Sequence, residues 1–362
     1  MLCIYDILSL FLFALFCLEY RRRYSKNSCN KIYYFGVFVL MFVMCFKSST
    51  TGEGMGDLQQ YVNLYLGKMS MYDNDEVEPG LKWICNILHA LPESEFLFIT
   101  ATSLIIMLPI LIGIKQFSES KSYSLMMLLT MQGVWLVVFC AMRQALAQSF
   151  ILAAILIYVN REKYKYWKYI VCAFLVASTF FHSTPFIVIP LCIGAIFIPD
   201  KKKYLYMALF VSLLLSGVVY SLLASAFLNY FGGIDEIARI TVYIEEETYG
   251  MDTGYNILNY APMTLLAFAL VYYNDKMAAN GYFIKAFVLG VVIYNLLGNI
   301  PLVNRAVCFF FILGAIGAVT KIKSGKQFGM MAVLILYFIW RNYVHYAEQP
   351  QSAYLPYHFI WE

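Results

Sequence analysis

Long apolar runs recur along most of the chain and constrain its fold more than any other feature. Runs such as residues 96–114 and 204–223 are long enough to cross about 30 Å of hydrocarbon as α-helices. Lipid offers no hydrogen-bond partner to the backbone, so a spanning segment must be a helix or part of a closed barrel. Continuous apolar runs favour helices, because barrel strands alternate in polarity. The sequence therefore predicts an all-α polytopic integral membrane protein.

The composition agrees with this prediction. Of 362 residues, 61% are hydrophobic and only 13% are charged, a balance unlike that of a soluble domain. We expect one transmembrane domain over residues 1–362, with about twelve helices. The apolar segments fall near residues 3–19, 32–46, 96–114, 123–140, 145–159, 168–181, 185–199, 204–223, 255–273, 282–298, 305–320 and 327–343.

The charges between these segments predict the topology. Two long connections, residues 48–95 and 224–254, are acidic, whereas the basic residues cluster in the connections that alternate with them. Basic residues favour the cytoplasmic side of a membrane, so the two acidic loops are predicted to be external. The first apolar segment is predicted to be a retained helix with an external amino terminus, because its basic cluster follows it. The basic clusters are residues 21–31, 115–121, 161–168, 201–203 and 321–326.

Three isolated polar residues stand at the predicted external ends of apolar segments, namely Arg143, His182 and Arg305. Arginine suits phosphate because its planar fork donates two hydrogen bonds at once, and histidine can hold or transfer a proton. Together with Arg239 in the second external loop, they predict a site for a pyrophosphate. The alternative is that the arginines contact lipid headgroups and that His182 makes only a local hydrogen bond beside Pro185.

The first external loop supplies candidate bases. Asp57 and Glu78 each precede a predicted amphipathic segment, and either carboxylate could deprotonate a sugar hydroxyl; the alternative is that both are only solvated. Tyr61 is one of many external tyrosines that suit sugar binding or a membrane-interface belt. Lys47 reads as a helix-end anchor. No metal site is expected, since the short pattern of residues 73–75 is too common to indicate one.

The order of these motifs resembles the EpsG/Wzy group of bacterial polysaccharide polymerases. The resemblance implies a glycosyltransferase-C-like helical fold and a metal-independent transferase in the bacterial cytoplasmic membrane. It implies polymerisation of undecaprenyl-pyrophosphate-linked oligosaccharide repeat units at the outer face. The matching motifs are Asp57 with Tyr61, Glu78-x-Gly80, Arg143-Gln144 with Ala147, Phe181-His182-Ser183, Asn304-Arg305 and Leu355-Pro356-Tyr357.

The chemistry of such a transfer gives the residues named above their expected roles. The expected catalytic residues are Asp57, Glu78, Arg143, His182 and Arg305, and the expected substrate-binding residues are Tyr61, Gln144, Arg239, Asn304 and Tyr357. No cofactor and no nucleic acid is expected, and a chain-length regulator and a flippase are expected partners. Two other classes stay open from the sequence. They are a membrane O-acyltransferase that modifies surface glycans and a flippase or transporter for lipid-linked glycans.

Overall fold

The computed structural model describes most of the chain, and this part consists of helices and their connections. The described residues are 3–51, 57–68, 77–131, 133–231, 257–274, 277–298, 300–317, 322–348 and 355–361. Within these ranges the chain forms fifteen α-helices and one short 3-10 helix, with no β-strand. Most of the second predicted external loop, including Arg239, lies outside the described residues.

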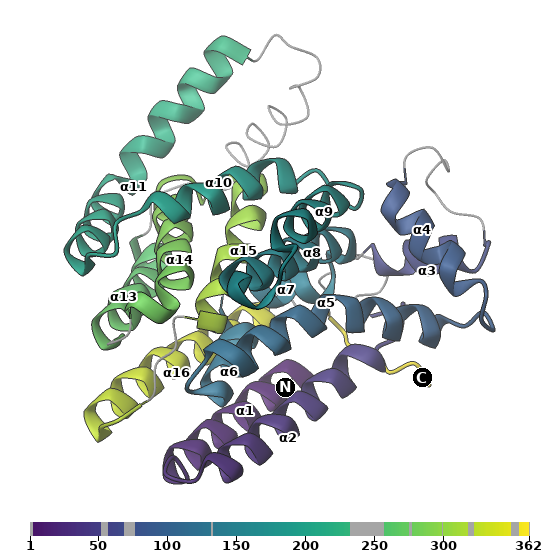
Figure 1. Ribbon diagram of the computed structural model, residues 1–362, viewed down its shortest axis with the longest axis horizontal. Helices are drawn as coiled ribbons and strands as arrows, with labels where there is room; N and C mark the ends of the chain where they lie inside the picture. The colour runs from purple at the N-terminus through teal and green to yellow at the C-terminus, as the bar shows by residue number, and fades with distance from the viewer. Residues whose placement is uncertain are drawn as a thin grey trace.

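The helices follow one another along the chain (Figure 1). In chain order they are α1 (Ile4–Arg21), α2 (Lys26–Cys45), α3 (Leu58–Tyr65), α4 (Pro79–Leu88), α5 (Glu95–Phe117), α6 (Lys121–Thr130), α7 (Val134–Phe139), α8 (Met142–Val159), α9 (Trp167–Thr179), α10 (Pro185–Phe197), α11 (Lys202–Phe231), α13 (Ile257–Tyr273), α14 (Met277–Leu297), α15 (Pro301–Gly317) and α16 (Gly325–Glu348).

Several of these helices have the length and composition of membrane spans. In the described part of the chain, α2, α5 and α8 are long and apolar enough to cross a membrane, and shorter apolar helices accompany them, among them α9 and α10. These apolar helices identify an integral membrane protein. The number of spans, about twelve, stays a prediction.

One predicted segment differs from the structure. The apolar run of residues 123–140 forms two helices, α6 and α7, rather than one. Gly133, between them, has a φ of +73°, which residues with a side chain rarely adopt. The Sγ atom of Cys308 also lies 2.7 Å from the position of a Cβ atom on Gly133. The apolar run therefore breaks at Gly133, where the backbone turns with a positive φ and where Cys308 of α15 leaves no room for a side chain.

Two packing features place the candidate site. α8 packs against α5 and α9, and its first turn follows directly on the short helix α7. α3 and α4 lie together at one side of the molecule, beside the beginning of α5 (Figure 1). Both short helices belong to the predicted first external loop, so this loop folds back over the helix ends instead of extending away from them.

α14 and α15 pack closely because glycines of one helix face aromatic rings of the other. A Cβ atom on Gly314 would overlap the ring of Phe287, and one on Gly317 would overlap the ring of Phe283. In a bilayer, small residues allow two backbones to approach and gain dispersion contacts that lipid does not supply. Gly314 is therefore predicted to be a packing residue that tolerates no side chain.

Gly314→Ala should lower the free energy of unfolding by about 1–3 kcal/mol, because an added methyl group overpacks this contact. Gly194→Ala in α10 is the matched control, since no atom lies within 4 Å of its Cβ position, and it should be neutral or stabilising by up to about 1 kcal/mol. Thermal unfolding of the detergent-solubilised variants, followed by size-exclusion chromatography, measures both. Equal stability of the two variants would contradict the packing role.

Candidate functional site

The guanidinium of Arg143, at the start of α8, joins the membrane helices to the short helices of the first loop. Its Nε donates a hydrogen bond to the Tyr61 hydroxyl at 2.6 Å, and its Nη1 donates to Glu78 Oε2, also at 2.6 Å. The Arg143 and Glu78 side chains are 22% and 26% exposed, so the ion pair is partly open to a ligand. Among the described residues, Nη2 of Arg143 has no partner.

Tyr61 extends this contact to a second carboxylate. Its hydroxyl donates to Asp57 Oδ2 at 2.8 Å, four residues earlier at the start of α3. Burial, and then the negative charge of Asp57, raise the pKa of Tyr61, so the phenol keeps its proton. A protonated phenol can donate to Asp57 and accept from Arg143 at the same time. The result is one hydrogen-bonded chain from Asp57 through Tyr61 and Arg143 to Glu78.

Glu78 is placed by the way in which α4 begins. Pro79 is the first residue of α4, which holds Glu78 in an extended conformation at the N-cap position. The backbone N–H of Gly80 donates to the Phe180 carbonyl oxygen at 2.9 Å. A Cβ atom on Gly80 would lie 2.8 Å from that oxygen and from the Phe181 ring. Gly80 therefore allows α4 to dock against the end of α9. This contact brings Glu78 beside His182, the residue after Phe181.

His182 lies in the turn between α9 and α10. The backbone N–H of Thr184 lies 3.0 Å from His182 Nδ1, and the Thr184 hydroxyl lies 3.1 Å from it. A backbone N–H can only donate, so Nδ1 accepts and the proton of the neutral ring is on Nε2. Burial lowers the pKa of His182, and Arg143 and Arg305 lower it further, against the opposite effect of Glu78 and Asp57. His182 is thus a neutral hydrogen-bond donor through Nε2.

α15 brings two further predicted residues to the site. Gln144 Nε2 donates to the backbone carbonyl of Arg305 at 2.9 Å, which joins α8 to α15. The Arg305 side chain is exposed, and its charge acts on His182. Next to it, Asn304 Oδ1 is a buried acceptor with no hydrogen-bond partner among the described residues. Asp57, Glu78, Arg143, His182 and Arg305, all predicted as catalytic from the sequence, therefore lie in one electrostatic cluster.

The other predicted substrate-binding residues lie elsewhere or are not described. The Tyr357 hydroxyl donates to the Val43 carbonyl at 2.9 Å, and its ring packs near Tyr5 and Phe139, so this side chain holds the carboxyl-terminal segment against α2. Its contact with substrate stays a prediction. Arg239 lies outside the described residues, and its role also stays a prediction.

Lys47, predicted from the sequence only as a helix-end anchor, makes a specific buried contact that the sequence interpretation missed. It is 4% exposed, and its Nζ donates to the Phe139 carbonyl at 2.6 Å and lies 4.0 Å from the centre of the Phe139 ring. Burial lowers the pKa of Lys47 to about 8. The contact fixes the end of α7, three residues before α8 begins. One signal was available, since a lysine on the acidic side departs from the charge pattern of the loops.

The described residues contain no group of three or more histidine, cysteine, aspartate or glutamate side chains placed to bind a metal ion. The cations of the cluster are instead the two arginines. Absence of a metal from the reaction stays a prediction.

Comparison with known proteins identifies one family. Residues 31–359 match the sequence model of the EpsG family, so the match includes the whole cluster around Arg143. No curated protein and no solved structure matches the chain.

Tyr61→Phe should destabilise the protein by about 1.5–3 kcal/mol, because it removes a hydroxyl that is hydrogen-bonded to two charged groups. Tyr123→Phe is the control, since that buried hydroxyl has no hydrogen-bond partner among the described residues and its loss should be neutral or stabilising. Thermal unfolding in detergent compares the two variants. An unchanged stability of Tyr61→Phe would argue against the hydrogen-bonded chain.

His182 should titrate below its ordinary value of 6.5 and should carry its neutral-state proton on Nε2. The ring then stays neutral at neutral pH and gains charge only as the pH falls below its lowered pKa. Because the folded state disfavours the charged ring, stability should fall as the pH drops through 6.5. Nuclear magnetic resonance of ¹⁵N-labelled histidine, assigned with His182→Asn, measures pKa and tautomer. A midpoint above 6.5, or a proton on Nδ1, would be inconsistent with this geometry.

Proposed function

The chain belongs to the EpsG family, the family of Wzy-like polysaccharide polymerases, and from this premise we propose that it polymerises undecaprenyl-pyrophosphate-linked oligosaccharide repeat units at the outer face of the bacterial cytoplasmic membrane. The observation that carries the proposal is the Arg143 guanidinium, held between Tyr61 and Glu78 with an Nη2 that has no partner among the described residues. The charge pattern of the loops supports an external site, because the cluster uses the acidic first loop.

The proposed reaction is a glycosyl transfer between two lipid-linked glycans. A sugar hydroxyl of the acceptor attacks the anomeric carbon of the donor sugar, and the bond from that carbon to the diphosphate oxygen breaks. The electron pair leaves with the polyprenyl diphosphate, and the proton of the hydroxyl passes to a base. Such a reaction needs cations where the diphosphate charge develops and a carboxylate near the acceptor.

Arg143, Arg305 and His182 are proposed to hold the diphosphate. The two arginines stabilise its charge without a metal ion, since a guanidinium can donate two parallel hydrogen bonds to phosphate oxygens. His182 donates through Nε2 in its neutral form, so it orients an oxygen without needing to be protonated. Arg239 is proposed to assist from the second loop.

Asp57 and Glu78 are the proposed bases for the acceptor hydroxyl. Both are carboxylates whose positions are fixed by the same hydrogen-bonded chain, so each can be kept at a set distance from the diphosphate. Among the neighbouring acceptors, Asn304 Oδ1 suits a sugar hydroxyl, because a donor from the ligand would satisfy an atom that has no other partner among the described residues.

Arg143→Ala should reduce polymerisation by about 10²- to 10³-fold, because it removes a group that stabilises developing charge. The measurement is transfer between purified lipid-linked repeat units, together with the electrophoretic ladder of the surface glycan in cells. Arg161→Ala is the control, since Arg161 is an exposed residue after α8 and should support a normal ladder. A full ladder from Arg143→Ala at the normal protein level would remove Arg143 from the mechanism.

Deletion of the gene separates the polymerase from the other two classes. Loss of the ladder, with single repeat units still exported, supports a polymerase. An intact ladder without acyl groups would instead indicate an acyltransferase, and absence of exported repeat units would indicate a flippase.

A further inference from the structure

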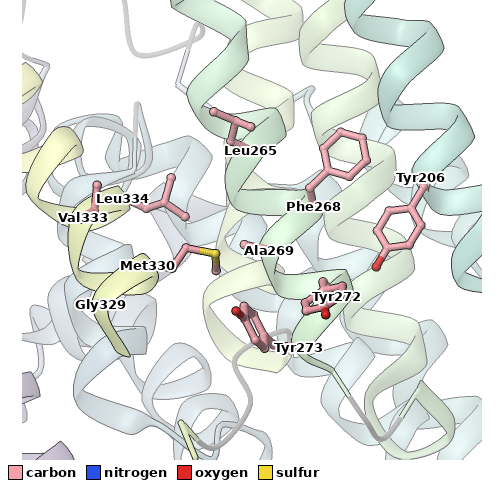
Figure 2. Close-up of a pocket in the computed structure, with 10 residues that line it drawn as sticks. All are labelled: Tyr206, Leu265, Phe268, Ala269, Tyr272, Tyr273, Gly329, Met330, Val333 and Leu334. Atoms are coloured by element: carbon pink, nitrogen blue, oxygen red, sulfur yellow. The ribbon is translucent and has the colours of Figure 1, made fainter. Parts of the chain in front are cut away.

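A wide apolar hollow opens on the surface between α13 and α16, and we name it the α13–α16 hollow (Figure 2). Its volume is about 770 Å³, within the range of about 300–1,000 Å³ that is common for ligand sites. Tyr272 and Val333, on its two walls, are each 66% exposed, so the hollow faces the bilayer. None of its lining residues comes from α3, α4, α8 or α15, which carry the charged groups of the candidate site.

One end of the α13–α16 hollow carries hydroxyl groups and the other is apolar. Tyr272 and Tyr273 line it at the last turn of α13, and Tyr206 lines it near the start of α11. Figure 2 shows the hydroxyls of these tyrosines on the lower side of the hollow, where Gly329 of α16 also lies, and Leu265 on the upper side. Tyrosine favours the level of the lipid headgroups. The tyrosine end is therefore the end that lies at a membrane surface.

Two lysines lie beside the tyrosine end. Lys202 precedes Tyr206 by one turn of α11, and its Nζ donates to the backbone carbonyl of Tyr272 at 2.9 Å. Lys326 precedes Met330 by one turn of α16, and residues four apart share one face of a helix. In the described part of the chain neither amine pairs with a carboxylate, and no lining residue of the hollow is acidic. The hollow thus ends at two positive charges that the protein does not compensate.

The charge pattern of the chain predicts that this end is cytoplasmic. Lys202 and Lys326 belong to the basic clusters 201–203 and 321–326, which are both predicted to be on the cytoplasmic side. Asp200, two residues before Lys202, pairs instead with Lys285 of α14 at 3.0 Å. The cytoplasmic leaflet contains anionic phospholipids, and lysines near its surface are attracted to them. A lipid with a negative headgroup therefore matches both parts of the hollow.

We propose that the α13–α16 hollow binds an anionic phospholipid of the cytoplasmic leaflet, with an acyl chain between the two helices and the phosphate beside Lys202 and Lys326. The tyrosine hydroxyls can donate to its oxygens, and the apolar walls contact the acyl chain. A zwitterionic lipid with the same chains fills the apolar part equally well but gains less from the two amines. Headgroup charge therefore decides which lipid binds. The site is separate from the proposed polymerase site and does not depend on it.

Native mass spectrometry of the delipidated protein tests the role of the two lysines. The unchanged protein should retain phosphatidylglycerol in preference to phosphatidylcholine with the same acyl chains. Lys202→Gln/Lys326→Gln should weaken binding of phosphatidylglycerol about 25-fold, or about fivefold for each lysine. Lys165→Gln/Lys168→Gln is the control, because it removes two exposed lysines from another basic cluster, and it should bind normally. Equal binding of the two lipids by the unchanged protein, or an equal loss in the two double variants, would overturn the proposal.

Photocrosslinking locates the lipid without removing either lysine. A photoreactive amino acid is placed at Met330, in the hollow, or at Leu336, which is exposed on α16 but does not line the hollow. In vesicles that contain both lipids, Met330 should label phosphatidylglycerol selectively, whereas Leu336 should label the two lipids in proportion to their abundance. Labelling without preference at Met330 would contradict a specific site. Crosslinks from Met330 to a second copy of the chain would identify a protein interface instead and would also overturn the proposal.

Discussion

The paired guanidinium of Arg143 is the interaction on which the candidate site depends. A cation at the end of a membrane helix is costly unless other groups compensate its charge and its hydrogen-bond donors. Tyr61 and Glu78 do so, and both come from the short helices that precede α5. The contacts that stabilise the charge are therefore the same contacts that fasten α3 and α4 to α8. Loop structure and site electrostatics cannot be changed separately at this position.

The site is built from helix ends, and proline defines two of them. Pro79 begins α4 directly after Glu78, and Pro185 begins α10 three residues after His182. A helix start leaves backbone N–H groups without partners, and here they bind the site itself: Gly80 N–H reaches the end of α9, and Thr184 N–H reaches the imidazole. Helix breaks inside an apolar protein thus supply the directed donors that position Glu78 and His182.

The sequence was informative where an isolated polar residue interrupts or ends an apolar run. Arg143 and His182 were predicted to share a site because isolated polar groups in apolar runs are visible without a structure. The pairing of Arg143 with Glu78 was not predictable, since the two lie 65 residues apart and meet only through the docking of α4. The burial of Lys47 was not predictable either, since the segment that pairs with its backbone, at Phe359, comes from the other end of the chain.

In the proposed reaction, the ion pair between Arg143 and Glu78 has to change when the donor binds. A diphosphate carries more negative charge than a carboxylate and can accept two parallel hydrogen bonds from one guanidinium, so it competes with Glu78 for Arg143. Glu78 then loses its cation and gains the capacity to accept a proton from the acceptor hydroxyl. Asp57 is coupled to Arg143 only indirectly, through the neutral hydroxyl of Tyr61. On the proposed reaction, Glu78 rather than Asp57 is therefore the carboxylate that would act as the base, and it would become available only when a donor is present.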